Sequence, residues 1–178
     1  ITSAFDEDKL RISAAALKKQ RLISVGEGEA GLVESLIDNG VDAYGVDFDE
    51  SYKSKNLPFT QKNQSHYQWG NALELSKHPF SKNPPDYIVS FCMLCQLDDA
   101  ASTKALIEAA KAVKPGGEVR YSTFIHGIFP EDPKAIAKIV RNAVTTLRRQ
   151  GIQTEVYLAR LNYKFPGQTD PRPAEFIL

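Results

Sequence analysis

The sequence predicts an α/β fold: an open, mostly parallel seven-stranded sheet with helices on both faces and an antiparallel C-terminal β-hairpin. Short apolar segments that suit strands alternate five times with segments of helical periodicity. Such alternation is typical of a parallel sheet covered by helices on both faces. The last two strand-like segments follow one another without a helical pattern between them, so we expect them to pair as a hairpin at one edge.

The first half of the chain accounts for three of the expected strands. An apolar face formed by Leu10, Ala14 and Leu17 indicates a helix at the start. Gly40 follows a second apolar stripe and should end that helix. The expected elements are helices over 6–19, 30–39 and 49–56, strands over 21–25, 42–48 and 66–70, and a loop over 71–85.

The second half begins with a near-continuous apolar run over 86–94, which suits a central strand buried on both faces. Asp98 or Asp99 can cap the helix that follows, and Pro and Gly of the Lys-Pro-Gly-Gly stretch at 114–117 should end it. The remaining expected elements are a strand over 118–124, a helix from Pro133 to before Gly151, and strands over 154–165 and 174–178.

Length and charge restrict the class of protein. The 178 residues suit a single domain over 1–178. Lys and Arg number 22 and Asp and Glu number 22, so the net charge of zero gives no broad attraction to nucleic acid or to an anionic membrane. No apolar run approaches the roughly 18 residues of a membrane span, and no signal peptide is visible, so we expect a cytoplasmic protein. Cys92 and Cys95 lack the further ligands that a metal site needs, and we expect reduced thiols and no metal.

A glycine-rich stretch, Val-Gly-Glu-Gly-Glu-Ala-Gly, follows the first expected strand. Gly26, Gly28 and Gly31 fit the G-x-G-x-x-G pattern of a dinucleotide-binding turn. A pyrophosphate at a helix N-terminus would be opposed by the carboxylates of Glu27 and Glu29. S-adenosylmethionine carries a sulfonium and an ammonium and no phosphate, so the charges favour this ligand. The alternative interpretation is that both glutamates point to solvent and do not select a ligand.

Four separate stretches should meet at one edge of the sheet. Ligands of open parallel sheets bind beyond the carboxyl ends of the strands, where the strand order reverses. Four segments lie at or directly after the expected strand ends: 26–31, 47–48, 70–72 and 90–91. We therefore expect one ligand site at this edge.

The chain resembles the class I, Rossmann-like S-adenosylmethionine-dependent methyltransferases from about residue 20 to residue 178, with residues 1–19 as an N-terminal helix. The resemblance lies in the stretches LISVGEGEAG, YGVDFDE, WGNALEL, PDYIVSFCMLCQLDD and AAKAVKPGGEV. The last is the most distinctive, because nucleotide dehydrogenases do not regularly show it before the fifth strand. The closing hairpin is also the family's usual ending. The resemblance implies S-adenosylmethionine as cofactor.

The resemblance implies roles for residues near the methionine end of the cofactor. Gly26 and Gly28 would let the backbone approach the methionine moiety, and Glu27 would lie beside its charged end. Ser90 and Phe91 would line the same end.

Further roles concern the adenosine end. Asp47 would accept hydrogen bonds from both ribose hydroxyls, because a carboxylate offers two acceptor oxygens. Phe48 would pack on the adenine ring. Asn71 would meet the adenine amino edge, and Ala72 would offer its backbone N–H to a ring nitrogen.

The chain departs from the family pattern at three positions. Ser24 stands where an acidic residue is frequent, Ala30 where a third glycine is frequent, and Asn71 replaces the usual acid. These departures keep open a non-catalytic S-adenosylmethionine-binding domain. The literal glycine pattern, with Asp47 lying 21 residues after Gly26, keeps open an NAD-dependent oxidoreductase.

Catalysis requires proximity of donor and acceptor, with a general base only where the acceptor must lose a proton. His126, after the fifth expected strand, is the candidate base, since a histidine titrates near neutral pH. The fourth strand ends in VSFCML, without the Asn-Pro-Pro-Tyr signature that this family uses on amino groups of DNA bases or glutamine. This leaves small molecules, proteins and RNA as acceptors, and of these we expect a small molecule.

Overall fold

The structure is a computed structural model that describes residues 14–26, 31–48, 64–91, 93–122, 133–156, 158–163 and 172–177. Its helices are α2 (Ala14–Leu17), α3 (Gly31–Asp38), α6 (Asp99–Ala112) and α7 (Pro133–Arg149). Its strands are β1 (Arg21–Val25), β2 (Asp42–Asp47), β3 (Tyr67–Trp69), β4 (Tyr87–Phe91), β5 (Glu118–Ser122), β6 (Leu158–Tyr163) and β7 (Arg172–Ile177). Short 3₁₀ helices are η1 (Gln64–His66), η2 (Ala72–Lys77), η3 (Pro79–Lys82) and η4 (Leu94–Gln96).

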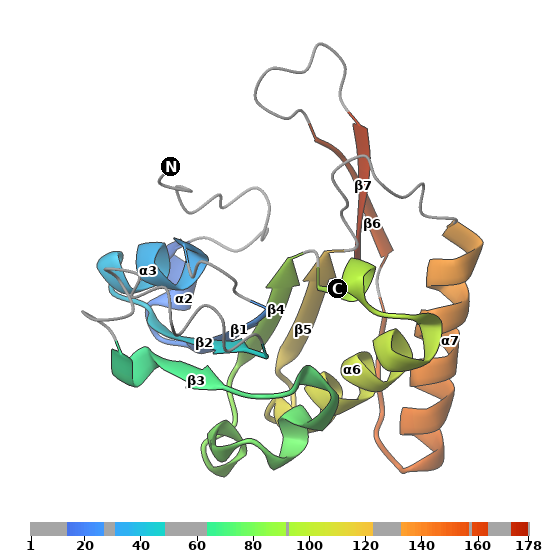
Figure 1. Cartoon of the computed structure of the whole chain (residues 1–178), viewed down its shortest axis with the longest axis horizontal. Helices are drawn as coiled ribbons and strands as arrows, with labels where there is room; N and C mark the ends of the chain where they lie inside the picture. Colours follow the sequence, from blue (N-terminus) through green and yellow to red (C-terminus); the bar gives the residue numbers. More distant parts are fainter. Residues whose placement is uncertain are drawn as a thin grey trace.

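The strands follow the order β3-β2-β1-β4-β5-β7-β6 (Figure 1). The first five are parallel to their neighbours, and the order reverses between β1 and β4, which lie side by side. β7 pairs antiparallel with β5 and with β6. The predicted α/β fold with a parallel sheet is thereby confirmed, and its switch point lies at the carboxyl ends of β1 and β4.

The buried side chains of β1 alternate between two hydrophobic clusters, as expected for a strand covered on both faces. Ile23 and Val25 belong to the cluster that includes residues of α6 and α7. Leu22 belongs to the cluster with Val33 and Leu36 of α3. Figure 1 shows α2 and α3 together on one side of the sheet and α6 and α7 on the other. The prediction of helices on both faces is therefore confirmed.

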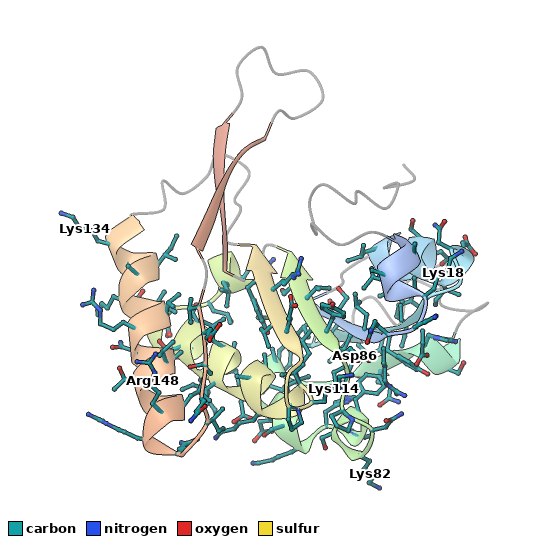
Figure 2. The ribbon with its side chains drawn as sticks, turned by 180° about the vertical axis from the view of Figure 1, so that it is seen from behind. Lys18, Lys82, Asp86, Lys114, Lys134 and Arg148 are labelled. Atoms are coloured by element: carbon teal, nitrogen blue, oxygen red, sulfur yellow. The ribbon has the colours of Figure 1, made fainter. Side chains whose placement is uncertain are left out.

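Asp86 ties together three segments at the amino ends of the strands. Its carboxylate accepts a hydrogen bond from the backbone N–H of Arg21 at 2.7 Å and forms an ion pair with Lys114. Its carbonyl oxygen accepts from the N–H of Glu118 at 2.9 Å. Figure 2 shows Asp86 and Lys114 beside one another at this end of the sheet. A Cβ atom on Gly117 would lie 2.7 Å from the Asp86 carbonyl oxygen, so the chain requires glycine there.

Several predicted boundaries agree with the structure. Asp98 caps α6, with its Oδ1 accepting from the N–H of Ala101 at 2.7 Å. Gly40 and Gly151 follow α3 and α7 with φ of 78° and 80°, the left-handed conformation that ends helices. α7 begins at Pro133, as expected for proline in a first helical turn.

Other predictions were wrong in detail. The segment 71–85 is not a plain loop, because η2 and η3 form within it, capped by the side chains of Asn71 and His78. The fourth strand ends at Phe91 instead of continuing to 94, and the sequence pattern missed this because the following turn is also apolar. β1 has the expected bounds, and the remaining strands differ from theirs by a few residues. The predictions for 6–13 and 49–56 lie outside the described residues.

Candidate functional site

A cavity of about 450 Å³ lies at the carboxyl ends of β1, β2 and β3 and beside the turn after β4. This is the edge at which the sequence predicted a ligand site. Twelve residues from these four segments line the cavity: Val25, Gly26, Val46, Asp47, Phe48, Gly70, Asn71, Ala72, Leu73, Met93, Gln96 and Leu97.

Gly26 forms the turn at the end of β1. Its φ is +75°, a conformation that side chains other than glycine rarely adopt. Its N–H donates to the carbonyl oxygen of Val46 at 2.8 Å, so the turn is fixed to β2. A Cβ atom at this position would lie 3.0 Å from the Cβ of Met93. A side chain here would therefore meet the opposite wall of the cavity, and glycine keeps that space open.

Asp47 and Phe48 lie at the end of β2. Asp47 is half-buried, and its carbonyl oxygen accepts from the N–H of Gly70 at 2.9 Å. Phe48 is 74% exposed and lines the cavity. A carboxylate and an open aromatic ring thus stand side by side in sequence at the cavity wall.

Asn71 and Ala72 follow β3. The Oδ1 of Asn71 accepts from the N–H of Leu73 at 2.9 Å and so caps η2. An amide oxygen has two lone pairs and the amide nitrogen has two hydrogens, so this side chain keeps hydrogen-bonding capacity for a ligand. Sequence reasoning expected Asn71 at an adenine edge and did not expect its role as a helix cap.

The structure places the other predicted site residues differently. Ser90 is 1% exposed, its hydroxyl has no hydrogen-bond partner among the described residues, and it is not among those that line the cavity. Phe91 ends β4, and its side chain lies outside the described residues. Glu27, Gly28 and His126 also lie outside them. The structure therefore brings together Gly26, Asp47, Phe48, Asn71 and Ala72.

Sequence reasoning missed the wall formed by the turn after β4. Met93, Gln96 and Leu97 belong to this turn and line the cavity. We had assigned 86–94 to one strand, although Asp98 as an N-cap requires a turn before it. A strand that ends earlier would have placed these residues at the same edge as Gly26.

The described part of the cavity wall has little charge of its own. Of the twelve lining residues, Asp47 alone carries a titratable side chain. Within the described ranges, no group of three or more His, Cys, Asp or Glu could hold a metal ion. The same described residues contain no helix that is long and apolar enough to cross a membrane. The site therefore combines one carboxylate with amide, apolar and backbone groups.

Comparison with known proteins identifies the family. The family described as "Methyltransferase domain" matches residues 2–149, which is most of the chain. The chain belongs to this methyltransferase family. Its members use S-adenosylmethionine as cofactor, and the methyltransferase resemblance seen in the sequence is confirmed. No curated protein sequence matches the chain.

Solved structures with the same fold include several methyltransferases. A glycopeptide N-methyltransferase, MtfA, complexed with sinefungin, matches with a TM-score of 0.60 and 12% identity over 88% of this chain and 86% of that chain. The magnesium protoporphyrin IX methyltransferase ChlM from Synechocystis PCC 6803, with bound SAM, gives 0.57 and 13% over 96% and 76%. The PH0226 protein from Pyrococcus horikoshii OT3 gives 0.61 and 14% over 96% and 86%. At such identities the likeness establishes the Rossmann-like fold alone.

Proposed function

We propose that this methyltransferase transfers a methyl group from S-adenosylmethionine to a small-molecule acceptor, and that the cavity at the carboxyl ends of β1–β3 holds the cofactor. The observation that carries the proposal is the convergence of Gly26, Asp47, Phe48 and Asn71 on one cavity. These residues come from three strand ends and match three separate motifs of the resemblance.

The donor set of the cavity fits this cofactor. The glycine turn keeps space that a Cβ atom would occupy next to Met93. The carboxylate of Asp47 suits a pair of hydroxyl donors, and the open ring of Phe48 offers an apolar face of the kind that packs on a purine. No cationic side chain lines the described part of the cavity, as expected for a ligand without phosphate.

The proposed roles of the chain are binding, orientation and exclusion of water. Asp47 would hold the ribose, Phe48 the adenine face, and Asn71 with Ala72 the adenine edge. The backbone at Gly26 would approach the methionine end, as would Gly28 and Glu27 by resemblance. S-adenosylmethionine, when bound, supplies a methyl group on a sulfonium that a nucleophile can take up. Correct alignment of the acceptor can provide much of the acceleration.

The described lining offers no general base apart from Asp47, which we assign to the cofactor. We propose His126, after β5, as the base for an acceptor that must lose a proton. We expect His126→Ala to lower turnover about 10²- to 10⁴-fold and to leave cofactor affinity unchanged, since a positioned base contributes on this scale. Steady-state kinetics on the acceptor, beside a cofactor titration, measure both quantities. An unchanged turnover would remove His126 from the mechanism.

Ser90 and Phe91 are proposed at the methionine end by resemblance alone. The buried hydroxyl of Ser90 lacks a hydrogen-bond partner within the described residues, so it still has a donor and an acceptor to offer. The small-molecule acceptor is supported by the absence of the amino-group signature after β4. The proteins of similar fold include a glycopeptide N-methyltransferase and a magnesium protoporphyrin IX methyltransferase, whose named acceptors differ in chemistry.

A non-catalytic S-adenosylmethionine-binding domain is the second candidate. Position 24, where the family often has an acid, holds a buried serine that is not among the residues lining the cavity. We also propose that residues 1–178 form one domain. In it, β6 and β7 form a hairpin that completes a sheet of seven strands. The support is the antiparallel pairing of β7 with β5 at Tyr121 and Ser122.

Isothermal titration with S-adenosylmethionine, S-adenosylhomocysteine and NAD tests the proposal. We expect micromolar binding of both sulfur ligands and none of NAD. Binding of NAD alone would favour the oxidoreductase and contradict our interpretation of Glu27 and Glu29. Binding of the sulfur ligands without methyl transfer to any acceptor of a small-molecule panel would favour the non-catalytic domain.

A further inference from the structure

We infer that His78 is a positioning residue for the cofactor cavity: its buried ring supports the backbone at Gly70 and thereby sets the wall formed by Gly70 and Asn71. The inference rests on the proposed function, because it concerns the affinity of that same cavity. His78 does not line the cavity, so it would act through the residues that do.

His78 occupies the junction between η2 and η3. Its side chain is almost fully enclosed, with 9% of the residue exposed. Its backbone N–H donates to the carbonyl oxygen of Leu75 at 3.1 Å, which closes η2. Its Nδ1 accepts from the N–H of Phe80 at 3.5 Å, which caps η3. The rings of His78 and Phe80 also pack, with centroids 4.7 Å apart. The ring is therefore held by its contacts with η3.

The same ring fills the space beside Gly70. A Cβ atom at Gly70 would lie 2.6 Å from Cδ2 of His78, 2.8 Å from its Nε2 and 3.0 Å from Cγ1 of Val46. The two distances to His78 are shorter than real Cβ contacts, so a side chain at Gly70 would require the ring to move. Gly70 itself is fixed to β2 by its N–H bond to the Asp47 carbonyl oxygen at 2.9 Å. The ring thus lies against Gly70, which lines the cavity and is bonded to Asp47 of the same cavity.

The hydrogen bonds of the ring define its chemical state. Because Nδ1 accepts from Phe80, the neutral ring carries its hydrogen on Nε2, which is the atom nearer to Gly70. Burial lowers the pKa of His78, against a smaller raising effect of a hydrogen bond with the Trp69 backbone. One ring therefore links η3 through Nδ1 to the end of β3 through its other edge.

Two substitutions separate the capping role from the positioning role. In His78→Asn, the amide oxygen replaces Nδ1 as the cap acceptor for η3, but no ring remains beside Gly70. In His78→Ala, both functions are lost. We expect His78→Asn to keep a melting temperature well above that of His78→Ala, while both variants bind S-adenosylhomocysteine about tenfold more weakly than the wild type, within the range of interactions between contacting residues.

A double-mutant cycle tests the contact itself. Gly70→Ala alone should weaken binding about tenfold, because the new methyl group must displace the ring. In Gly70→Ala combined with His78→Ala the methyl group has space, so the double variant should bind at least as well as Gly70→Ala alone. The matched control is Val140→Ala in α7, a buried core position away from the cavity, which should lower the melting temperature without changing affinity.

The titrations are made below the melting temperature of every variant, and the wild type serves as reference. A wild type that does not bind S-adenosylhomocysteine would count against the proposed function, whereas wild-type binding with altered variants bears on His78. Wild-type affinity in His78→Asn would overturn the inference, because the cap alone would then suffice. Additive losses in the double variant would overturn it as well, because the two residues would then act independently.

Discussion

The amino ends and the carboxyl ends of the parallel strands are built in contrasting ways. At the amino ends, Asp86 joins β1, the first residue of β5 and the turn at Lys114 through paired polar groups. At the carboxyl ends, backbone bonds from Gly26 and Gly70 hold the strand ends together around an open cavity. The first arrangement satisfies its polar groups within the protein, while the second leaves a carboxylate, an amide and an exposed ring available to a ligand.

The difference shows how one sheet separates stability from binding. A bonded network such as that around Asp86 is costly to break, because it leaves buried donors without partners. The polar groups of a cavity contribute free energy of binding only when the ligand is bound. Glycine is needed there because its missing side chain leaves space for the ligand. Substitutions at the amino ends should therefore change the free energy of unfolding, and substitutions at the carboxyl ends should change affinity.

The largest effect should come from Asp47. We expect Asp47→Ala to weaken S-adenosylmethionine binding by about 1.5–3 kcal/mol, the scale of hydrogen bonds to a charged group. Isothermal titration measures this loss. Asp42→Ala, at the other end of β2, is the matched control, because Asp42 is exposed and its ion pair with Arg21 is 3.9 Å long. Equal affinity in the Asp47 and Asp42 variants would show that the ribose is not held at the end of β2.

The next effect should come from Asp86. We expect Asp86→Ala to lower the free energy of unfolding by about 1–3 kcal/mol, since the Arg21 N–H loses its acceptor and Lys114 its partner. Denaturant unfolding measures the change, and cofactor affinity should stay at the wild-type value. Asp99→Ala, which removes only the exposed ion pair with Lys138 at 3.3 Å, should cost about 1 kcal/mol or less. A loss of affinity in Asp86→Ala without loss of stability would reverse the assignment of the two ends.

The smallest effect should be a pH dependence of stability from His78. Burial lowers its pKa in the folded protein below the ordinary value of 6.5, so the unfolded chain binds more protons between these two values. The free energy of unfolding should therefore keep its full value above pH 6.5 and decrease as the pH falls below 6.5. Thermal unfolding across this window should show a shallower fall in His78→Asn than in the wild type. Parallel slopes would mean that another group governs the window.

The sequence revealed much of the fold because strand and helix patterns agree with their punctuation. Gly40, Asp98 and Gly151 marked helix ends that the structure shows, and the apolar runs marked β1 and β4. Five predicted site residues meet at the cavity for the same reason, since parallel strands end at one edge.

What the sequence did not reveal depends on contacts between distant segments. Ser90 is buried and does not line the cavity, and this orientation depends on the strands that pair with β4. His78 is buried because Phe80 and Gly70 both lie against its ring. The turn at 93–97 resembles a continuation of β4 in the sequence, because Met93, Leu94 and Leu97 are apolar, and Met93 and Leu97 line the cavity. Tertiary context decided each of these positions.

Amide hydrogen exchange with and without S-adenosylhomocysteine tests the contrast between the two ends most directly. We predict that ligand slows exchange in peptides that cover 69–75 and 93–98, where the cavity wall lies. Peptides that cover 85–86 and 114–118, at the amino ends, should exchange at an unchanged rate. Protection confined to the amino-end peptides, or equal protection at both ends, would contradict the placement of the ligand at the carboxyl ends of the strands.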